Sequence, residues 1–159
     1  MTTPNEKTAR AYIELLEINK TATKGYKEAA EGVTNPQVKS ELNRFAQQRA
    51  QFTNELTQQA SRLGVDPNKT TVEGALTEVA VAVHRSWINV KSAVTGHDDA
   101  AILSECENGD MSALKAYDNA LQAPDMPAPV KSVIEHQRTE IMSAKNTVSR
   151  LKSSAKPMR

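Results

Sequence analysis

Polar side chains interrupt the apolar stripes of four predicted helices near their midpoints. Asn19 and Gln48 do so in the first half of the chain, and Asp110, Gln137 and Glu140 do so in the second. Antiparallel helices of similar length have their midpoints at one height, so we expect Asn19, Gln48, Asp110 and Glu140 to meet in a single central layer. Carboxylates and carboxamides in such a layer either bind a metal ion or satisfy one another by hydrogen bonds.

The positions of these residues correspond to those of a di-metal carboxylate centre. Such a centre takes one Glu from each of two helices and a Glu-x-x-His from each of the other two. Both histidines and two of the four carboxylates are missing here, although iron and manganese need those ligands. We therefore predict no catalytic residue, no cofactor and no metal ligand, and we interpret the layer as hydrogen-bonded rather than as a degenerate metal centre. The vestigial ligand positions are Asn19, Gln48, Gln51, Asp110, Glu140 and Ser143.

The other reactive side chains do not converge. Cys106 has no neighbouring cysteine and no evident base, so core packing is its expected role. Tyr26 and Tyr117 are interpreted as core residues with their hydroxyl groups at the edge. The three histidines fall at different levels of the helices, so a shared metal ion is not expected. They are His84, His97 and His136.

An internal repeat indicates the architecture. Residues 24–29 recur as residues 115–120, and each repeated tyrosine is followed ten residues later by a proline, Pro36 or Pro127. Asn19 and Asp110 each lie seven residues before those tyrosines. The repeat unit is a helix, a tight corner and a second helix, so two copies predict a four-helix bundle.

Capping residues, glycines and prolines set the predicted boundaries. Asn35 and Pro36 open one helix, Asp98 caps another, and Gly32 is a candidate left-handed C-cap. No segment shows the alternation typical of a strand. The chain is predicted to be one all-α domain over residues 1–153, followed by a disordered tail at 154–159. The five helices are expected at about 4–31, 36–63, 71–95, 98–123 and 127–152.

The third helix carries the widest apolar stripe and must bury it. If this helix runs back along the outside of the bundle, helices 36–63 and 98–123 become parallel and are joined by a long helical crossover. That is the ferritin-like arrangement. We expect the stripe to pack on the bundle, with a homo-oligomer contact as a further possibility. The residues expected in that contact are Val79, Val83, Trp87 and Val90.

Composition argues against several classes of protein. The chain has 20 basic and 19 acidic side chains, a net charge of +1 and 4% aromatic residues, which does not favour nucleic-acid binding. The most apolar stretch, residues 79–83, is too short to span a bilayer, and no signal peptide is evident. A single cysteine fits a reducing compartment, so a cytoplasmic location is expected.

Several motifs, taken in order along nearly the whole chain, resemble the bacterial four-helix-bundle proteins of unknown function in the ferritin-like superfamily. The resemblance implies a ferritin-like bundle in a bacterial cytoplasm, and it implies no established activity. By position, it places rubrerythrin-type ligand sites on the six vestigial positions. The expected function is a non-enzymatic structural or interaction role with a link to stress; the alternative is a degenerate metal-binding or oxidase protein. The motifs are residues 17–20, 25–30, 46–52, 63–64, 84–87, 106–110 and 115–117.

Overall fold

The computed structural model describes residues 6–66, 78–96 and 98–155. Within those residues the protein has five α-helices and no strand, which confirms the all-α prediction. None of the described helices combines the length and hydropathy that crossing a membrane requires. The helices are α1 (Glu6–Gly32), α2 (Pro36–Gln59), α3 (Glu78–Thr95), α4 (Asp99–Leu121) and α5 (Ala128–Ser154), with a 3-10 turn, η1 (Ala60–Leu63), after α2.

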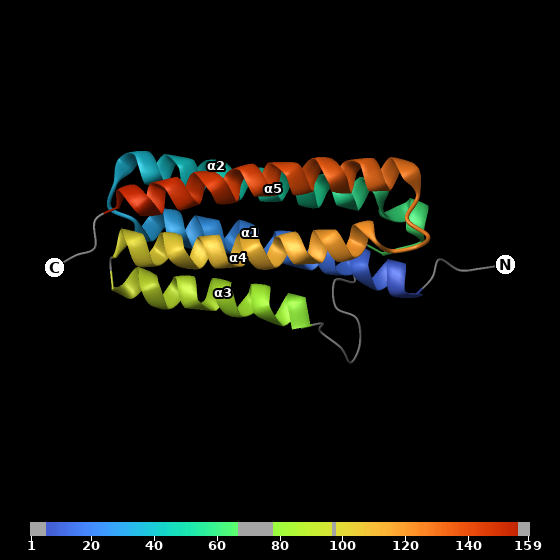
Figure 1. Cartoon of the computed structure of the whole chain (residues 1–159), viewed down its shortest axis with the longest axis horizontal. Helices are drawn as coiled ribbons and strands as arrows, with labels where there is room; N and C mark the ends of the chain where they lie inside the picture. The colour runs from blue at the N-terminus through green and yellow to red at the C-terminus, as the bar shows by residue number, and fades with distance from the viewer. Residues whose placement is uncertain (1–5, 67–77, 97, 156–159) are drawn as a thin grey trace.

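Four of the helices form a bundle, and the fifth lies along its outside. Successive helices run in opposite directions, so α2 and α4 are parallel and α3 forms the crossover between them (Figure 1). The helix pairs α1–α2, α1–α4 and α4–α5 pack closely, whereas α2 and α5 contact each other little. Helix α3 packs on α1 and α4.

The helix boundaries differ from the expected ones in several places. Helix α2 ends at Gln59 and tightens into the 3-10 turn, which Gly64 closes with a positive φ of 65°. The expected start of the third helix at 71–77 lies outside the described residues. At the C-terminus, Ser154 is still helical, and the rest of the expected tail beyond residue 155 lies outside the described residues.

Side-chain caps fix the corner where α2 and α4 begin. The Asn35 side chain accepts hydrogen bonds from the first backbone amides of α2, and Asp98 does the same for α4. The Asp99 carboxylate accepts from the backbone N–H groups of Thr34 and Asn35, at 2.9 and 3.1 Å. These bonds satisfy N–H donors that the start of a helix leaves unpaired, and the bonds of Asp99 join the start of α4 to the start of α2.

A single indole ring docks α3 onto the bundle. A Cβ atom on Gly25 would lie 2.2 Å from Trp87 Cε3, and one on Gly109 would lie 2.7 Å from Trp87 Cε2. Two glycines on neighbouring helices therefore leave the space that the indole fills, because any larger residue would collide with the ring. Tyr26 lies beneath the indole, with ring centroids 4.8 Å apart.

Gly32 has a similar role and is not a left-handed cap. Gly64 is the glycine with a positive φ among the described residues, whereas Gly32 ends α1 in helical conformation. A Cβ on Gly32 would lie 2.6 Å from Val94 Cγ2. The prediction of a left-handed cap at Gly32 is therefore wrong, and close packing of α3 explains this glycine.

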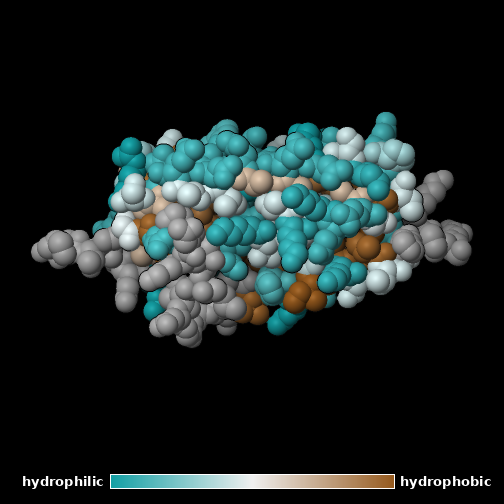
Figure 2. All heavy atoms as spheres, turned by 180° about the vertical axis from the view of Figure 1, so that it is seen from behind, coloured by the Kyte–Doolittle hydropathy of each residue, from teal (hydrophilic) through white to brown (hydrophobic). Residues whose placement is uncertain are grey.

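The stripe expected to form a subunit contact is used inside the chain. Val83, Trp87 and Val90 are buried against the bundle, and the side chain of Val79 lies outside the described residues. Figure 2 shows a mostly hydrophilic face in which hydrophobic side chains gather toward the lower part, where α3 lies. Among the described residues, the large hydrophobic side chains that stay exposed are Val81, Ile88 and Met111.

Candidate functional site

The interior of the bundle contains polar residues that form two hydrogen-bonded groups. Asn19, Arg49, Asp110 and Gln137 are all buried and come from α1, α2, α4 and α5 respectively. Buried polar groups are costly unless they are paired. The partners of each residue therefore decide what the site can do.

The first group is a buried ion pair. Arg49 Nη1 donates to Asp110 Oδ1 at 2.7 Å, and Nη2 donates to Oδ2 at 3.2 Å. The two side chains are 1% and 0% exposed. The Tyr26 hydroxyl donates to Asp110 Oδ2 at 2.5 Å, and the Arg49 guanidinium lies 5.2 Å from the centroid of the same tyrosine ring. Arg49 Nε donates to Gln48 Oε1 at 3.1 Å.

The second group is a neutral chain that ends at a carboxylate. Asn19 Nδ2 donates to the Tyr117 hydroxyl at 2.8 Å, and that hydroxyl donates to Gln137 Oε1 at 2.7 Å. Gln137 Nε2 donates to Glu55 Oε1 at 2.9 Å. The chain of hydrogen bonds therefore runs from the interior, through α4 and α5, to a half-buried carboxylate on α2.

The two groups are related by the internal repeat. Tyr26 of the first repeat binds Asp110 of the second, and Tyr117 of the second binds Asn19 of the first. Because α1 and α4 run in opposite directions, each tyrosine meets the polar residue that lies seven positions before the other tyrosine. One of those residues is a carboxylate and the other is a neutral amide. A cation is therefore required on one side only, and Arg49 supplies it.

Burial keeps the hydroxyl and thiol groups of the interior protonated. Burial raises the pKa of Tyr26 well above its ordinary value, and the Asp110 carboxylate raises it further. Burial likewise raises the pKa of Tyr117 and of the Cys106 thiol. Burial acts to lower the pKa of Arg49, but Asp110, Tyr26 and Tyr117 together outweigh it, and the pKa lies above the ordinary value. The interior therefore offers hydrogen-bond donors and no activated nucleophile.

The predicted single layer of four residues is wrong. Asn19 and Asp110 are buried as expected, but Gln48 and Glu140 are only half-buried. On α2 the next residue, Arg49, is buried in place of Gln48, and consecutive residues of a helix point about 100° apart. On α5 the inward residues are Ile141 and Gln137, and Gln137 is the other polar residue that the sequence placed in this stripe. The two remaining vestigial positions, Gln51 and Ser143, are exposed.

Sequence reasoning also missed the role of Arg49 and of the two tyrosine hydroxyls. The spacing of α2 contains the missing signal, because Arg49 takes one position in the apolar series Leu42, Phe45, Arg49, Phe52 and Leu56. The tyrosine hydroxyls lie at the centre of the bundle and not at its edge. Their bonds depend on the pairing of α1 with α4, which no single helix pattern contains.

The remaining candidate residues are separate from this centre. His84 and His136 are exposed, and His97 lies outside the described residues. Cys106 is buried as a free thiol. Among the described residues, no group of three or more His, Cys, Asp or Glu side chains is arranged to hold a metal ion. Both oxygens of Asp110 already accept hydrogen bonds, so the centre does not fit a di-metal group.

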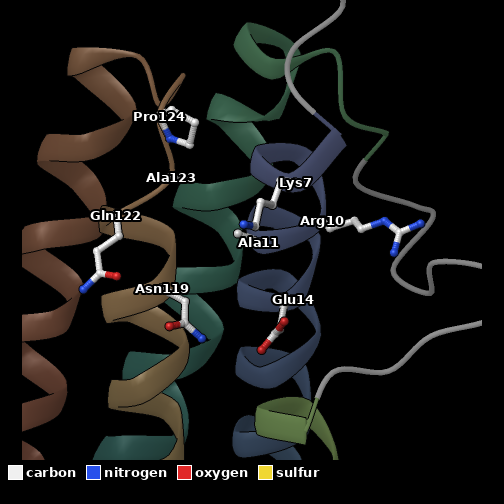
Figure 3. A pocket seen from close by; sticks show the side chains of 8 residues that line it. All are labelled: Lys7, Arg10, Ala11, Glu14, Asn119, Gln122, Ala123 and Pro124. Carbon is white, nitrogen blue, oxygen red and sulfur yellow. The ribbon is translucent and has the colours of Figure 1, made fainter.

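A pocket of about 380 Å³ lies between the start of α1 and the end of α4 (Figure 3). It contains no residue of the two hydrogen-bonded groups. Side chains of both charges line it together with amides, so the pocket favours neither an anion nor a cation. Its residues are Lys7, Arg10, Ala11, Glu14, Asn119, Gln122, Ala123 and Pro124.

Comparison with known sequences gives a family and no activity. Residues 7–123 match the family described as "Domain of unknown function (DUF2383)". The matched region runs from the first turn of α1 to just beyond α4, and α5 follows it. No curated protein matches the chain. The match covers most of the sequence, and the chain therefore belongs to the DUF2383 family.

Proposed function

We propose that this protein is a non-enzymatic helical bundle with a structural or interaction role. The observation that carries the proposal is the Arg49–Asp110 ion pair at the bundle centre. In a di-metal bundle, metal cations balance the charge of buried carboxylates. Here a guanidinium group balances Asp110, the one fully buried carboxylate in the part of the chain that the structure describes.

The chemistry of the centre supports a structural role. Arg49 and Tyr26 occupy both oxygens of Asp110, so that carboxylate has little capacity left for a metal ion. The buried Cys106 thiol and the tyrosine hydroxyls have raised pKa values, which makes them poor nucleophiles and poor bases at neutral pH.

We further propose a ferritin-like relationship, a bacterial origin, a cytoplasmic location and a link to stress. The internal repeat, the parallel α2 and α4, and the helical crossover between them support the ferritin-like relationship (Figure 1). The free thiol of Cys106 supports a reducing compartment. The bacterial origin and the link to stress rest on the resemblance of the motifs to that superfamily.

Metal analysis of untagged protein, produced with added iron and manganese, tests the proposal. We expect neither metal at a stoichiometric level and no oxygen consumption when ferrous iron is added. Near-stoichiometric iron or manganese that is lost in a folded Asp110→Asn or Glu140→Ala variant would instead establish the degenerate metal-binding or oxidase protein. Circular dichroism of each variant provides the control for folding.

Self-association is part of the same proposal, with a second copy of the chain as the partner. The buried stripe of α3 is not available for it, so the contact falls on Val81 and Ile88 of α3 and on Met111 of α4. Ile88 is 55% exposed, and burying such a side chain favours association. Light scattering should detect a dimer that Ile88→Glu weakens, whereas a strict monomer at high concentration would remove this part of the proposal.

A further inference from the structure

Tyr26 differs from the other two tyrosines of the chain in the group that accepts its hydroxyl proton. The Tyr26 hydroxyl donates to a carboxylate oxygen of Asp110 at 2.5 Å, which is the length of a hydrogen bond to a charged acceptor. The Tyr12 hydroxyl donates to a backbone carbonyl, and the Tyr117 hydroxyl donates to the side-chain carbonyl of Gln137. A carboxylate can take up a proton, whereas an amide oxygen does not do so at neutral pH. Tyr26 is therefore the tyrosine whose hydroxyl bonds to a proton acceptor.

The single tryptophan of the chain packs against the same tyrosine. The ring centroids of Trp87 and Tyr26 are 4.8 Å apart, and the ring planes are tilted by 58°. Aromatic rings at this separation are in contact. An electron can pass between two such rings without an intermediate group. Tyr26 thus has an electron acceptor, an oxidised indole, on one side and a proton acceptor at its hydroxyl.

The indole nitrogen of Trp87 has no group to which it could pass its own proton. Nε1 is buried, and no hydrogen-bond acceptor meets it among residues 6–66, 78–96 and 98–155. A Cβ on Gly109 would lie 2.9 Å from Nε1, so α4 closes tightly over this edge of the ring. A buried donor without a partner calls for a physical explanation. An oxidised indole that cannot release this proton remains a radical cation, which is a stronger oxidant than the neutral indolyl radical.

A groove of about 220 Å³ between α1 and α3 gives access to the indole. Trp87 and Gly25 both line the groove, and Gly25 has no side chain to cover the ring. Lys24 and Lys91 line it as well, together with one histidine and with Glu28. The two ammonium groups outnumber the carboxylate, so the local field favours the approach of a small anion.

We propose that Trp87 and Tyr26 form an electron-transfer pair, which carries one oxidising equivalent from the groove to the bundle centre. The oxidant is a small anionic radical such as the carbonate radical, which takes one electron from Trp87 and leaves as carbonate. Tyr26 then returns one electron to the indole radical cation, while its hydroxyl proton moves to Asp110. The products are neutral Trp87, a neutral phenoxyl radical at Tyr26 and a protonated Asp110. The total charge of the three groups is therefore the same before and after this second step.

The ion pair with Arg49 does not prevent the proton transfer. The two bonds from Arg49 make Asp110 a weak base, but a phenol that has lost an electron is a very strong acid. The proton moves along a hydrogen bond that already exists. Burial and the Asp110 carboxylate raise the pKa of Tyr26, so its hydroxyl is protonated before oxidation and must release the proton when the electron leaves. The electron-transfer pair goes beyond the proposed function and does not depend on it.

Pulse radiolysis that generates the carbonate radical tests the electron-transfer pair. We expect the absorbance of the indole radical to decay while that of a phenoxyl radical grows at the same rate, independently of protein concentration. Tyr26→Phe should abolish the phenoxyl signal and lengthen the lifetime of the indole radical. This change leaves both bonds from Arg49 to Asp110 in place, and circular dichroism checks the fold. Tyr117→Phe is the matched control, because it also removes a buried hydroxyl, and it should leave the phenoxyl signal unchanged.

Three results would overturn the proposal. The first is decay of the indole radical in the parent chain without a phenoxyl radical. The second is an undiminished phenoxyl signal in Tyr26→Phe, which would place the radical on another tyrosine. The third is an equal phenoxyl yield in Trp87→Phe, which would show that the indole is not the point of entry.

Two further measurements test the proton acceptor and the class of oxidant. The second step should be slower in heavy water, because the hydroxyl proton moves with the electron, and an equal rate would contradict transfer to Asp110. The first step should be slower at high salt and in Lys91→Gln, since both weaken the attraction of an anion to the groove. Equal rates in all three conditions would contradict an anionic oxidant.

Discussion

Replacing Arg49 by methionine should be one of the most damaging single changes in this protein. The Arg49 and Asp110 side chains are 1% and 0% exposed, so water screens neither charge. Arg49→Met removes both hydrogen bonds to Asp110, as well as the bond from Arg49 Nε to Gln48, and leaves the Asp110 carboxylate with the Tyr26 hydroxyl as its partner. Breaking a buried ion pair in this way costs about 3–5 kcal/mol in the free energy of unfolding.

A second substitution should then restore part of that loss. In Arg49→Met/Asp110→Asn no buried charge remains, and the new amide oxygen can still accept the bond from Tyr26. The remaining cost is that of unpaired amide hydrogens, about 1–3 kcal/mol. The double variant is therefore expected to be more stable than Arg49→Met alone.

Equilibrium unfolding in urea, followed by circular dichroism and by the fluorescence of Trp87, measures these differences. The matched control is Arg138→Met, because Arg138 pairs with Asp118 at the surface, where the side chains are 33% and 47% exposed. That change should cost about 0–1 kcal/mol. The reasoning is refuted if Arg49→Met costs no more than the surface control, or if the double variant is less stable than Arg49→Met.

Three further predictions concern packing and pH. Gly109→Ala should cost about 1–3 kcal/mol and change the emission of Trp87, because the added methyl group would lie 2.7 Å from the indole; an unchanged melting temperature would contradict the tight fit. Since burial raises the pKa of Tyr117, its hydroxyl should stay protonated in the folded protein above its ordinary value of 10.0. Stability should fall as pH rises above that value, because the unfolded chain then loses the proton; tyrosinate absorbance that develops fully before unfolding would argue against this. Hydrogen bonds from Lys152 and Ser149 lower the pKa of Glu107, so its stabilisation is present above the ordinary value of 4.5 and is lost as pH falls through the folded value. Glu107→Gln should therefore reduce the acid sensitivity of the urea midpoint, and an identical pH profile would show that the contact contributes nothing.

Residues that act within one helix could be interpreted correctly from the sequence. Asn35, Pro36 and Asp98 begin α2 and α4 as expected, because a capping side chain bonds to amides two and three residues away. The repeat also identified Asn19 and Asp110 as buried, since residues at the same place in two copies occupy equivalent positions. These are local or duplicated features, and a single chain contains all the information that they need.

The partners of those residues depend on how the helices are rotated and paired. The apolar series of α2 places position 49, and not Gln48, on the buried face, but no pattern within that helix shows that Asp110 of α4 is the partner of Arg49. Tyr26 of α1 bonds to Asp110 of α4, and Asn19 of α1 bonds to Tyr117 of α4. Both hydrogen bonds form only when the two helices are in register. The apolar stripe of α3 could pack either on the bundle or on a second subunit. It packs on the bundle, where two glycines leave the space that the Trp87 indole fills.

The sequence by itself therefore determined an all-α chain of two repeated hairpins with polar residues in its interior. Only the tertiary structure decided that a guanidinium group, and not a layer of amides, balances the buried carboxylate. The physical reason is that hydrogen bonds and ion pairs form over about 3 Å, whereas periodicity in a sequence locates a side chain only to one face of a helix.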